Sequence, residues 1–275
     1  MSSRFWKMSG SGNDFVFLDG RTDGSQIAEW TSPEFVRSVC EPHTGVGADG
    51  VAIIEHSDDH DFRLRYFNRD GSLGELCGNA SLCATRLAVE LTVALPGAIS
   101  FETDAGVIRA RMRHGQPEID LQPPHDLKLD TGIAKGSGEK RLSFVNTGVP
   151  HLVIRSNDLA TIDLRSRGPE LRFHESLSAG ANVNWVAPDP EGGWRMRTYE
   201  RGVEAETLAC GTGAVACAVL LEAWGETVRG QPTSLRTKSG KQLTVTLRAK
   251  AGQTVPSLSG EGRIVFEGVL RDFRG

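Results

Sequence analysis

The sequence has no long hydrophobic run, since no stretch approaches the roughly 18 apolar residues that a membrane-spanning helix needs. Its opening residues also lack the apolar segment of a secretory signal. Blocks of like charge are missing too, because the net charge of -4 comes from interspersed acidic and basic residues. We therefore expect a cytoplasmic protein with neither a membrane nor a nucleic acid as partner.

Metal-binding patterns are also missing. There is no C-x-x-C pair, and the seven histidines form no H-E-x-x-H or H-x-H pattern. Five cysteines make an odd set, and structural disulfides are rare in the reducing compartment expected here. We expect free thiols and no metal site.

The chain contains an internal repeat. Three pairs of landmarks stand 133 residues apart and a fourth pair stands 134 apart, which indicates a duplication. The pairs are Cys77-Gly78-Asn79 with Cys210-Gly211-Thr212, Gly47-Ala48-Asp49 with Gly180-Ala181-Asn182, Tyr66 with Tyr199, and Ser100 to Thr103 with Ser234 to Thr237.

Each half is predicted to be rich in strands around one helix. Short segments such as 62–67, 107–112 and 243–247 alternate with the period of half-buried strands. Segments 79–91 and 212–224 are instead rich in Ala, Leu and Val, free of proline and long enough for three helical turns. A helix that is apolar on most of its surface must be surrounded.

The predicted fold is therefore α+β, with two pseudo-symmetric strand-rich halves, each wrapped around a central helix, and the active site in the cleft between them. Proline interrupts the pattern at Gln122-Pro123-Pro124, so the expected domains are 1–122 and 123–262. We expect the C-terminal strand, 263–275, to complete the N-terminal half.

Cys77 and Cys210 stand immediately before the two predicted helices, with Asn79 and Thr212 expected at the cap positions. A helix start favours an anion and lowers a thiol pKa from its free value of about 8.5. Its N–H groups also cradle carboxylates, and an adjacent glycine permits close approach. The alternative to a functional role is that each cysteine is a small buried hydrophobic residue and that Cys-Gly only marks the start of a helix. This alternative would suit either cysteine alone. Because the two cysteines stand at equivalent positions of a repeat, their joint presence indicates a functional pair of thiols.

The segment 211–216 also fits the dinucleotide pattern G-x-G-x-x-A. A dinucleotide-binding site needs a hydrophobic strand before this motif and an acidic residue at a strand end about 20 residues after it. This segment has neither. We expect no cofactor. Two thiols on opposite faces of a carbon would instead remove a proton and return one from the other side, which inverts the centre.

The chain resembles the diaminopimelate epimerase family over almost its whole length. The matching segments are Gly10-Ser11-Gly12-Asn13-Asp14-Phe15, Asn68-Arg69-Asp70-Gly71-Ser72 before Cys77-Gly78-Asn79, Pro150-His151, Asn182, and Glu200-Arg201-Gly202 before Ala209-Cys210-Gly211-Thr212-Gly213. These enzymes work without pyridoxal phosphate and interconvert LL- and meso-2,6-diaminopimelate on the lysine and peptidoglycan pathway.

The resemblance implies a role for each matching residue. Cys77 and Cys210 would be the acid/base pair, His151 would lie nearby as a supporting residue or a core histidine, and a homodimer is implied. The guanidinium of Arg201 suits the second carboxylate of the substrate, and the carboxylate of Glu200 suits a substrate ammonium group. The implied substrate-binding residues are Asn13, Asn68, Gly78, Asn79, Asn182, Glu200, Arg201, Gly211 and Thr212.

Three departures from the family pattern concern substrate recognition. Val149 stands where the family often has asparagine, Gly50 where it often has glutamine, and segment 78–83 differs after the first cysteine. Asn146 is a candidate to replace the amide lost at Val149. The departures leave open a racemase of the same fold that acts on another amino acid, such as histidine.

Two further alternatives belong to other classes. A non-catalytic binding protein would not require paired thiols. An isomerase of unsaturated acids need not bind an ammonium, so Glu200 and the asparagines disfavour it.

Overall fold

The computed structural model describes residues 2–21, 26–250 and 252–271, and the chain divides into two compact units. The first unit runs to Ile119 and resumes at Gly260, and the second is Asp120–Ser259. The last four residues of the predicted C-terminal strand, 272–275, lie outside the described residues.

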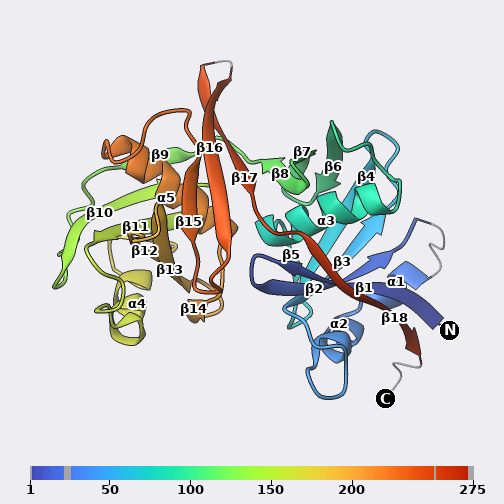
Figure 1. Ribbon diagram of the computed structural model, residues 1–275. Coiled ribbons are helices and arrows are strands. Elements are labelled where there is room, and N and C mark those ends of the chain that lie inside the picture. Colours follow the sequence, from blue (N-terminus) through green and yellow to red (C-terminus); the bar gives the residue numbers. More distant parts are fainter. Residues whose placement is uncertain (1, 22–25, 251, 272–275) are drawn as a thin grey trace. The chain divides into compact units, whose positions relative to one another are not determined.

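Most elements of each unit are strands (Figure 1). The first unit contains β1 (Ser2–Gly10), β2 (Asn13–Asp19), α1 (Ile27–Trp30), α2 (Pro33–Cys40), β3 (Gly50–Glu55), β4 (Phe62–Asn68), β5 (Leu73–Gly74), α3 (Gly78–Glu90), β6 (Ile99–Thr103), β7 (Gly106–Arg113), β8 (Gln116–Asp120), which ends at the unit boundary, and β18 (Arg263–Arg271). The second contains β9 (His125–Lys128), β10 (Glu139–Asn146), β11 (Pro150–Ser156), α4 (Leu164–Arg172), β12 (Asn182–Pro188), β13 (Trp194–Glu200), β14 (Ala205–Thr207), α5 (Gly211–Ala223), β15 (Thr233–Arg236), β16 (Gln242–Lys250) and β17 (Gln253–Ser259).

The strand pairing confirms the predicted repeat. In the first unit the strands pair in the order β18-β1-β2-β3-β4, and β4 also pairs with β5 and β6. In the second the order is β9-β10-β11-β12-β13, and β13 also pairs with β14 and β15. The parallel pairs fall at the same places, β2–β3 and β4–β6 in one unit and β11–β12 and β13–β15 in the other.

The predicted central helices are confirmed as α3 and α5, each within one residue of its expected bounds. Helix α3 contacts β1, β3, β4, β7 and β18, whereas α5 contacts β10, β11, β12, β16 and β17. Buried positions cover every side of α5 because its alanines and aliphatic residues are apolar all round. The small alanine side chains also let the surrounding strands approach closely.

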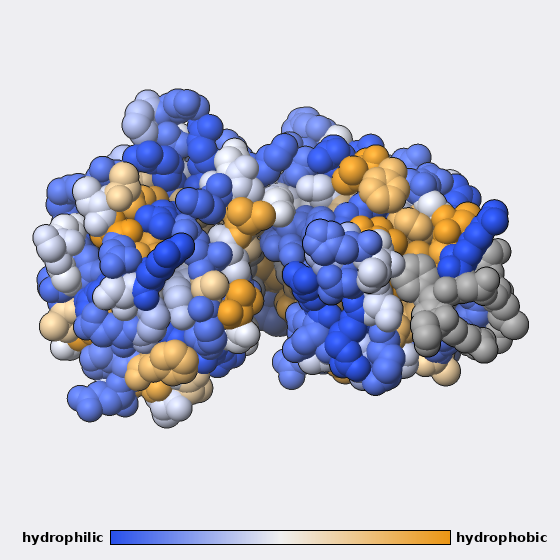
Figure 2. Space-filling model, turned by 90° about the horizontal axis from the view of Figure 1, so that it is seen from below, coloured by the Kyte–Doolittle hydropathy of each residue, from blue (hydrophilic) through white to orange (hydrophobic). Residues whose placement is uncertain are grey.

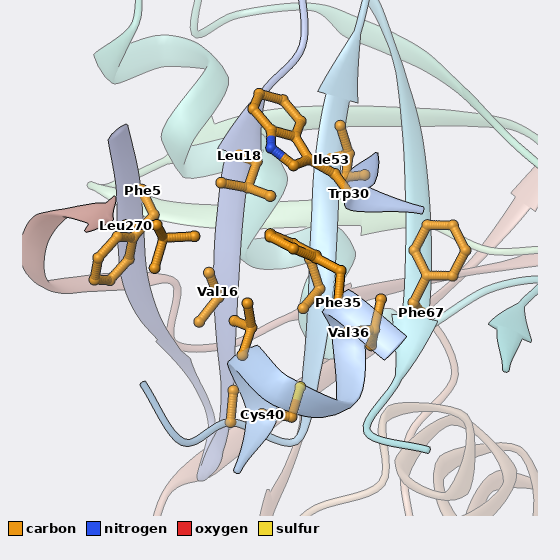
Figure 3. Close-up of a cluster of buried hydrophobic side chains, with 13 residues drawn as sticks. Phe5, Val16, Leu18, Trp30, Phe35, Val36, Cys40, Ile53, Phe67 and Leu270 are labelled. Atoms are coloured by element: carbon orange, nitrogen blue, oxygen red, sulfur yellow. The ribbon is translucent and has the colours of Figure 1, made fainter. Parts of the chain in front are cut away.

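A second layer, absent from the sequence-based prediction, covers the other face of each sheet. In the first unit, α1 and α2 pack their apolar side chains on β1, β2 and β3, as Figure 3 shows for Trp30, Phe35 and Val36 against Val16 and Leu18. Ser32 caps the start of α2, since its Oγ accepts the N–H of Phe35 at 3.2 Å, and Pro33 is the first helical residue. Helix α4 takes this place in the second unit, where Leu164 and Leu171 join the core around Trp185.

Hydrophilic side chains predominate on the face shown in Figure 2, and hydrophobic side chains appear there in separate patches. Among the described residues, no helix is long and apolar enough to cross a membrane.

Candidate active site

The first candidate cysteine lies at the start of α3. Cys77 is itself the N-cap residue, with extended backbone (φ -124°, ψ 113°), and Gly78 and Asn79 are the first helical residues. The prediction that Asn79 caps this helix was therefore wrong by two positions. The helix begins earlier because Gly78 adopts helical geometry directly after the extended Cys77. The half-buried Cys77 thus lies beside the N–H groups of the first helical turn.

A chain of amides and carboxylates leads away from this turn. Asn79 Nδ2 donates to Asn13 Oδ1 at 2.7 Å, and Asn13 Nδ2 donates to Asp49 Oδ2 at 2.9 Å. Asp49 also accepts the N–H of Asp14 at 3.2 Å, and the buried Lys7 forms an ion pair with Asp14 at 2.5 Å. Because Asp49 can only accept, it fixes the orientation of the Asn13 amide and, through it, that of Asn79.

Gly10 is required where this loop meets the helix. A side chain at this position would place Cβ 2.8 Å from the carbonyl oxygen of Asn79 and 3.0 Å from Cys83 Sγ. The G-S-G-N-D segment therefore brings Asn13 against the first turn of α3. Asn68 lies at the end of β4, is exposed and donates from Nδ2 to Ser72 Oγ at 3.0 Å.

The second candidate cysteine repeats this arrangement at the start of α5. Cys210 is the N-cap residue (φ -136°, ψ 111°), and its Sγ accepts the N–H of Gly213 at 3.3 Å. The prediction that Thr212 caps the helix was likewise wrong, because the sulfur of Cys210 fills that role. Thr212 Oγ1 lies 3.5 Å from the same sulfur. The carbonyl oxygen of Thr212 accepts from Thr147 Oγ1 at 3.1 Å, which ties the β10–β11 turn to the helix start.

The remaining predicted residues of the second unit cluster at the ends of neighbouring strands. Asn182 begins β12, and its Oδ1 accepts the backbone N–H of Arg201 at 2.8 Å. Glu200 ends β13 and is half-buried, while one guanidinium nitrogen of Arg201 donates to the carbonyl of Ala179 at 3.2 Å. Asn146 Oδ1 accepts the N–H of Gly148 at 3.0 Å, so a role of Asn146 toward substrate stays a prediction.

His151 is fully buried at the start of β11. Burial lowers the pKa of His151 to about 3, and the positive charge of Arg201 adds to the effect. The imidazole is therefore neutral at physiological pH. Its Nδ1 lies 3.0 Å from Asn184 Nδ2.

The sequence analysis assigned no role to four of the residues described above: Lys7, Asp49, Thr147 and Asn184. The sequence offered a signal for Lys7 and Asn184, because each is a polar residue between two large or branched apolar ones: Lys7 between Trp6 and Met8, and Asn184 between Val183 and Trp185. The sequence also offered a signal for Asp49, since the repeat pairs it with Asn182, a residue already predicted to bind substrate.

The three other cysteines are free thiols buried among apolar residues. Burial raises the pKa of the Cys40 thiol to about 12 and raises the pKa values of Cys83 and Cys217 well above the usual range. Within the described ranges, no group of three or more His, Cys, Asp or Glu side chains is placed to hold a metal ion.

Thiol labelling tests this difference in accessibility. In the fully reduced protein at pH 8, we expect iodoacetamide to modify Cys77, which is half-buried, well before Cys40, Cys83 and Cys217, which are 0% exposed. A thiol with a pKa of about 12 holds roughly 10³ times less thiolate at this pH than a free thiol of pKa about 8.5. Peptide mass spectrometry measures the order, and labelling in urea, where all five should react alike, is the control. Early labelling of Cys40 would contradict the burial described here.

Solved structures share this fold of two repeated, strand-rich units, each with a central helix. The chain superposes with a TM-score of 0.76 on a phenazine biosynthesis protein of the PhzF family from Bacillus anthracis, at 12% identity and over 98% of this chain and 99% of that one. It superposes with a TM-score of 0.70 on a probable proline racemase from Agrobacterium radiobacter K84, at 20% identity and over 97% and 92% of the two chains. At these identities the likeness shows the fold alone.

Closer relatives identify the family. The family model described as diaminopimelate epimerase matches residues 5–125 and 143–265. The diaminopimelate epimerase of Gemmatimonas aurantiaca is 46% identical over 97% of this chain and 98% of its own length. That of Aquifex aeolicus is 41% identical over 98% of both chains. The chain belongs to the diaminopimelate epimerase family, as its resemblance predicted.

Proposed function

We propose that this chain epimerises LL-2,6-diaminopimelate to the meso form, without a cofactor, in the supply of lysine and peptidoglycan precursors. The observation that carries the proposal is the repeated placement of a cysteine at the N-cap of a buried central helix, Cys77 on α3 and Cys210 on α5. Membership of the family supports the choice of substrate.

The proposed reaction is a proton exchange between two faces of one carbon. The thiolate of one cysteine takes the α-proton and becomes a thiol, and the electron pair of the broken C–H bond delocalises into the substrate carboxylate. The thiol of the other cysteine gives its proton to the opposite face and becomes a thiolate. No electrons are gained or lost, and the two cysteines exchange protonation states in each turnover.

The weak acidity of the α-proton makes stabilisation of the carboxylate the main requirement. We assign this role to the backbone N–H groups of Gly78, Asn79, Gly211 and Thr212, in the first turns of α3 and α5. Donors held in place before the reaction need no reorganisation as charge develops. Cβ-free glycine at the first helical position keeps each set of N–H groups accessible.

The distal end of the substrate carries a second ammonium and a second carboxylate. We assign these groups to Asn13, Asn68, Asn182, Glu200 and Arg201, with His151 in support. The guanidinium of Arg201 matches a carboxylate in geometry, and the carboxylate of Glu200 matches an ammonium. The hydrogen bond from the backbone N–H of Arg201 to Asn182 Oδ1 joins the residue after β13 to the start of β12, which supports the grouping of these residues.

Isotope exchange tests the function directly. Incubation of the reduced protein with LL-diaminopimelate in heavy water should replace the α-proton by deuterium and yield the meso isomer, both followed by NMR. Absence of exchange would contradict the proposal. Exchange on another amino acid, such as histidine, with none on diaminopimelate would favour the racemase with altered specificity.

We also propose that the protein is a cytoplasmic homodimer. The free, buried thiols Cys40, Cys83 and Cys217 suit a reducing compartment. Strand β18 pairs with β1 alone among the described strands, and its edge carries exposed Val265, Phe266 and Val269. Such an edge is a template for pairing with another chain, and a second copy would cover it.

Substitution on β18 tests the dimer. We expect Val269→Asp, at a side chain 53% exposed, to shift the protein from dimer to monomer in sedimentation velocity, because a charge would enter the apolar contact. The matched control is Phe173→Asp, at an apolar side chain 63% exposed that follows α4 in the second unit, which should leave the dimer intact. A native protein that sediments as a monomer at micromolar concentration would reject the proposed dimer.

A further inference from the structure

Three buried polar side chains of the second unit form one hydrogen-bonded chain. Thr198 on β13 lies opposite Asn184 on β12, and its Oγ1 lies 2.9 Å from Asn184 Oδ1. Asn184 Nδ2 lies 3.1 Å from the carbonyl oxygen of Leu152 and 3.0 Å from His151 Nδ1. Exposure is 0% for Asn184 and His151 and 3% for Thr198, so water does not compete for these bonds.

The partners of Asn184 determine which way its amide points. The carbonyl of Leu152 can only accept, so the amide nitrogen of Asn184 must face it. The hydroxyl of Thr198 then donates to Oδ1 on the other side. Each end of the amide is therefore fixed by a separate neighbour, and an amide flip would leave a carbonyl facing a carbonyl.

This orientation determines the tautomer of His151. The same amide nitrogen of Asn184 donates its second hydrogen to His151 Nδ1, which must be unprotonated to accept it. A neutral imidazole with a bare Nδ1 carries its proton on Nε2. Burial, followed by the charge of Arg201, lowers the pKa of His151 to about 3 and so favours the neutral ring.

Nε2 of His151 is buried, and none of the described residues accepts a hydrogen bond from it. A buried donor without an acceptor destabilises the folded state by about 1–3 kcal/mol, so the retention of such a donor calls for an explanation. Asn184 also packs against the start of α5, because a Cβ on Gly213 would lie 2.4 Å from Asn184 Oδ1. Gly213 in turn donates its N–H to Cys210 Sγ at 3.3 Å.

We propose that Asn184 is a positioning residue for the epimerisation: it holds His151 as the neutral Nε2–H tautomer, so that His151 is a hydrogen-bond donor and not a general base. Thr198 orients Asn184, and Gly213 lets the helix start of Cys210 pack against the same amide. This inference rests on the proposed function for its catalytic part, whereas the tautomer is a property of the protein alone.

The tautomer is measured without substrate. In protein labelled with ¹⁵N on its histidine rings, long-range proton–nitrogen NMR distinguishes a protonated ring nitrogen from a bare one. We expect one ring, absent from the spectrum of His151→Gln, to show a protonated Nε2 and a bare Nδ1 at neutral pH. A protonated Nδ1, or protonation of both nitrogens, would overturn the proposal whether or not the protein epimerises diaminopimelate.

Substitution of Asn184 tests the positioning role. Asn184→Asp keeps the shape but can only accept, so the Nδ1 of His151 should become protonated and the ¹⁵N pattern should change accordingly. We expect kcat to fall by roughly 10- to 100-fold with little change in KM, as for other groups that orient a site residue. An unchanged tautomer or an unchanged kcat would contradict the assignment.

Thr198 provides a second test if Asn184→Asp fails to fold. Thr198→Val keeps the volume and removes the donor to Asn184 Oδ1. We therefore expect kcat to fall, as in Asn184→Asp, and a smaller fraction of His151 to have an unprotonated Nδ1. Thr198→Ser, which retains the hydroxyl, should restore both the native ¹⁵N pattern and most of kcat. Equal behaviour of the valine and serine variants would reject a role for the hydroxyl.

Discussion

Replacing either Cys77 or Cys210 by alanine is expected to reduce the conversion of LL- to meso-diaminopimelate by at least roughly 10³-fold, the scale of a lost acid/base group. In the proposed mechanism each turnover uses one cysteine as base and the other as acid, so we expect neither variant to complete the inversion. Proton exchange in heavy water separates the steps, because the remaining thiolate can still exchange the α-proton on its own face.

The matched controls lie within the same two helices. Cys83→Ala and Cys217→Ala remove thiols that are fully buried and whose pKa values burial raises, so both variants should retain activity near that of the native protein. Thermal unfolding shows whether each variant is folded. Inversion within tenfold of native in either the Cys77→Ala or the Cys210→Ala variant would refute the two-cysteine mechanism.

The largest effect on stability is expected at Glu139, which lies at the centre of a buried ionic cluster in the second unit. Its carboxylate accepts from Arg167 Nη2 at 2.9 Å, Trp185 Nε1 at 3.1 Å and the N–H of Gly136 at 2.6 Å. Glu139→Ala leaves the Arg167 guanidinium and the indole N–H of Trp185 without this acceptor. We expect the free energy of unfolding in urea to fall by about 3 kcal/mol, as when one partner of a buried pair is removed.

Glu170 provides the matched control, because it pairs with the same Arg167 at 2.6 Å but its side chain is 60% exposed. Glu170→Ala should cost less than about 1 kcal/mol. A loss as large as that of Glu139→Ala would show that the burial of Glu139 contributes nothing.

The stability effect at Glu139 should depend on pH. Burial by itself would raise the pKa of Glu139, but the hydrogen bonds from Arg167, Gly136 and Trp185 together hold it below its usual value. A lowered carboxyl pKa contributes stability above the unfolded value of about 4.3, and this contribution is lost as the pH falls through the folded pKa. The difference between the native protein and Glu139→Ala should therefore shrink below about pH 4.

The elements that follow from side-chain periodicity were predicted well from the sequence. Helices α3 and α5 begin and end within one residue of their expected positions, because an apolar, proline-free run has few alternatives to a buried helix. The alternating segments became β4, β7 and β16 for the same kind of reason. The repeat, read from residue spacing alone, reappears in the order and direction of the strands.

The residues that hold the candidate site together could not be found this way, since their roles depend on partners far away in the chain. Asp49 orients Asn13 across 36 positions, and Asn184 meets His151 across 33. Hydrogen bonds of this kind arise only when strands are placed side by side, and a sequence pattern carries no information on which amide faces which acceptor.

The sequence by itself thus determined the repeat, the two central helices and the cysteines beside their starts, because hydrophobic periodicity and helix-breaking residues act locally. Only the tertiary structure decided that the cysteines are the caps themselves, that a second helical layer covers each sheet, and that Asn184 lies between His151 and Thr198. Those features depend on the packing of segments distant in sequence, where burial removes water as a competing partner and leaves each polar atom dependent on its protein neighbours.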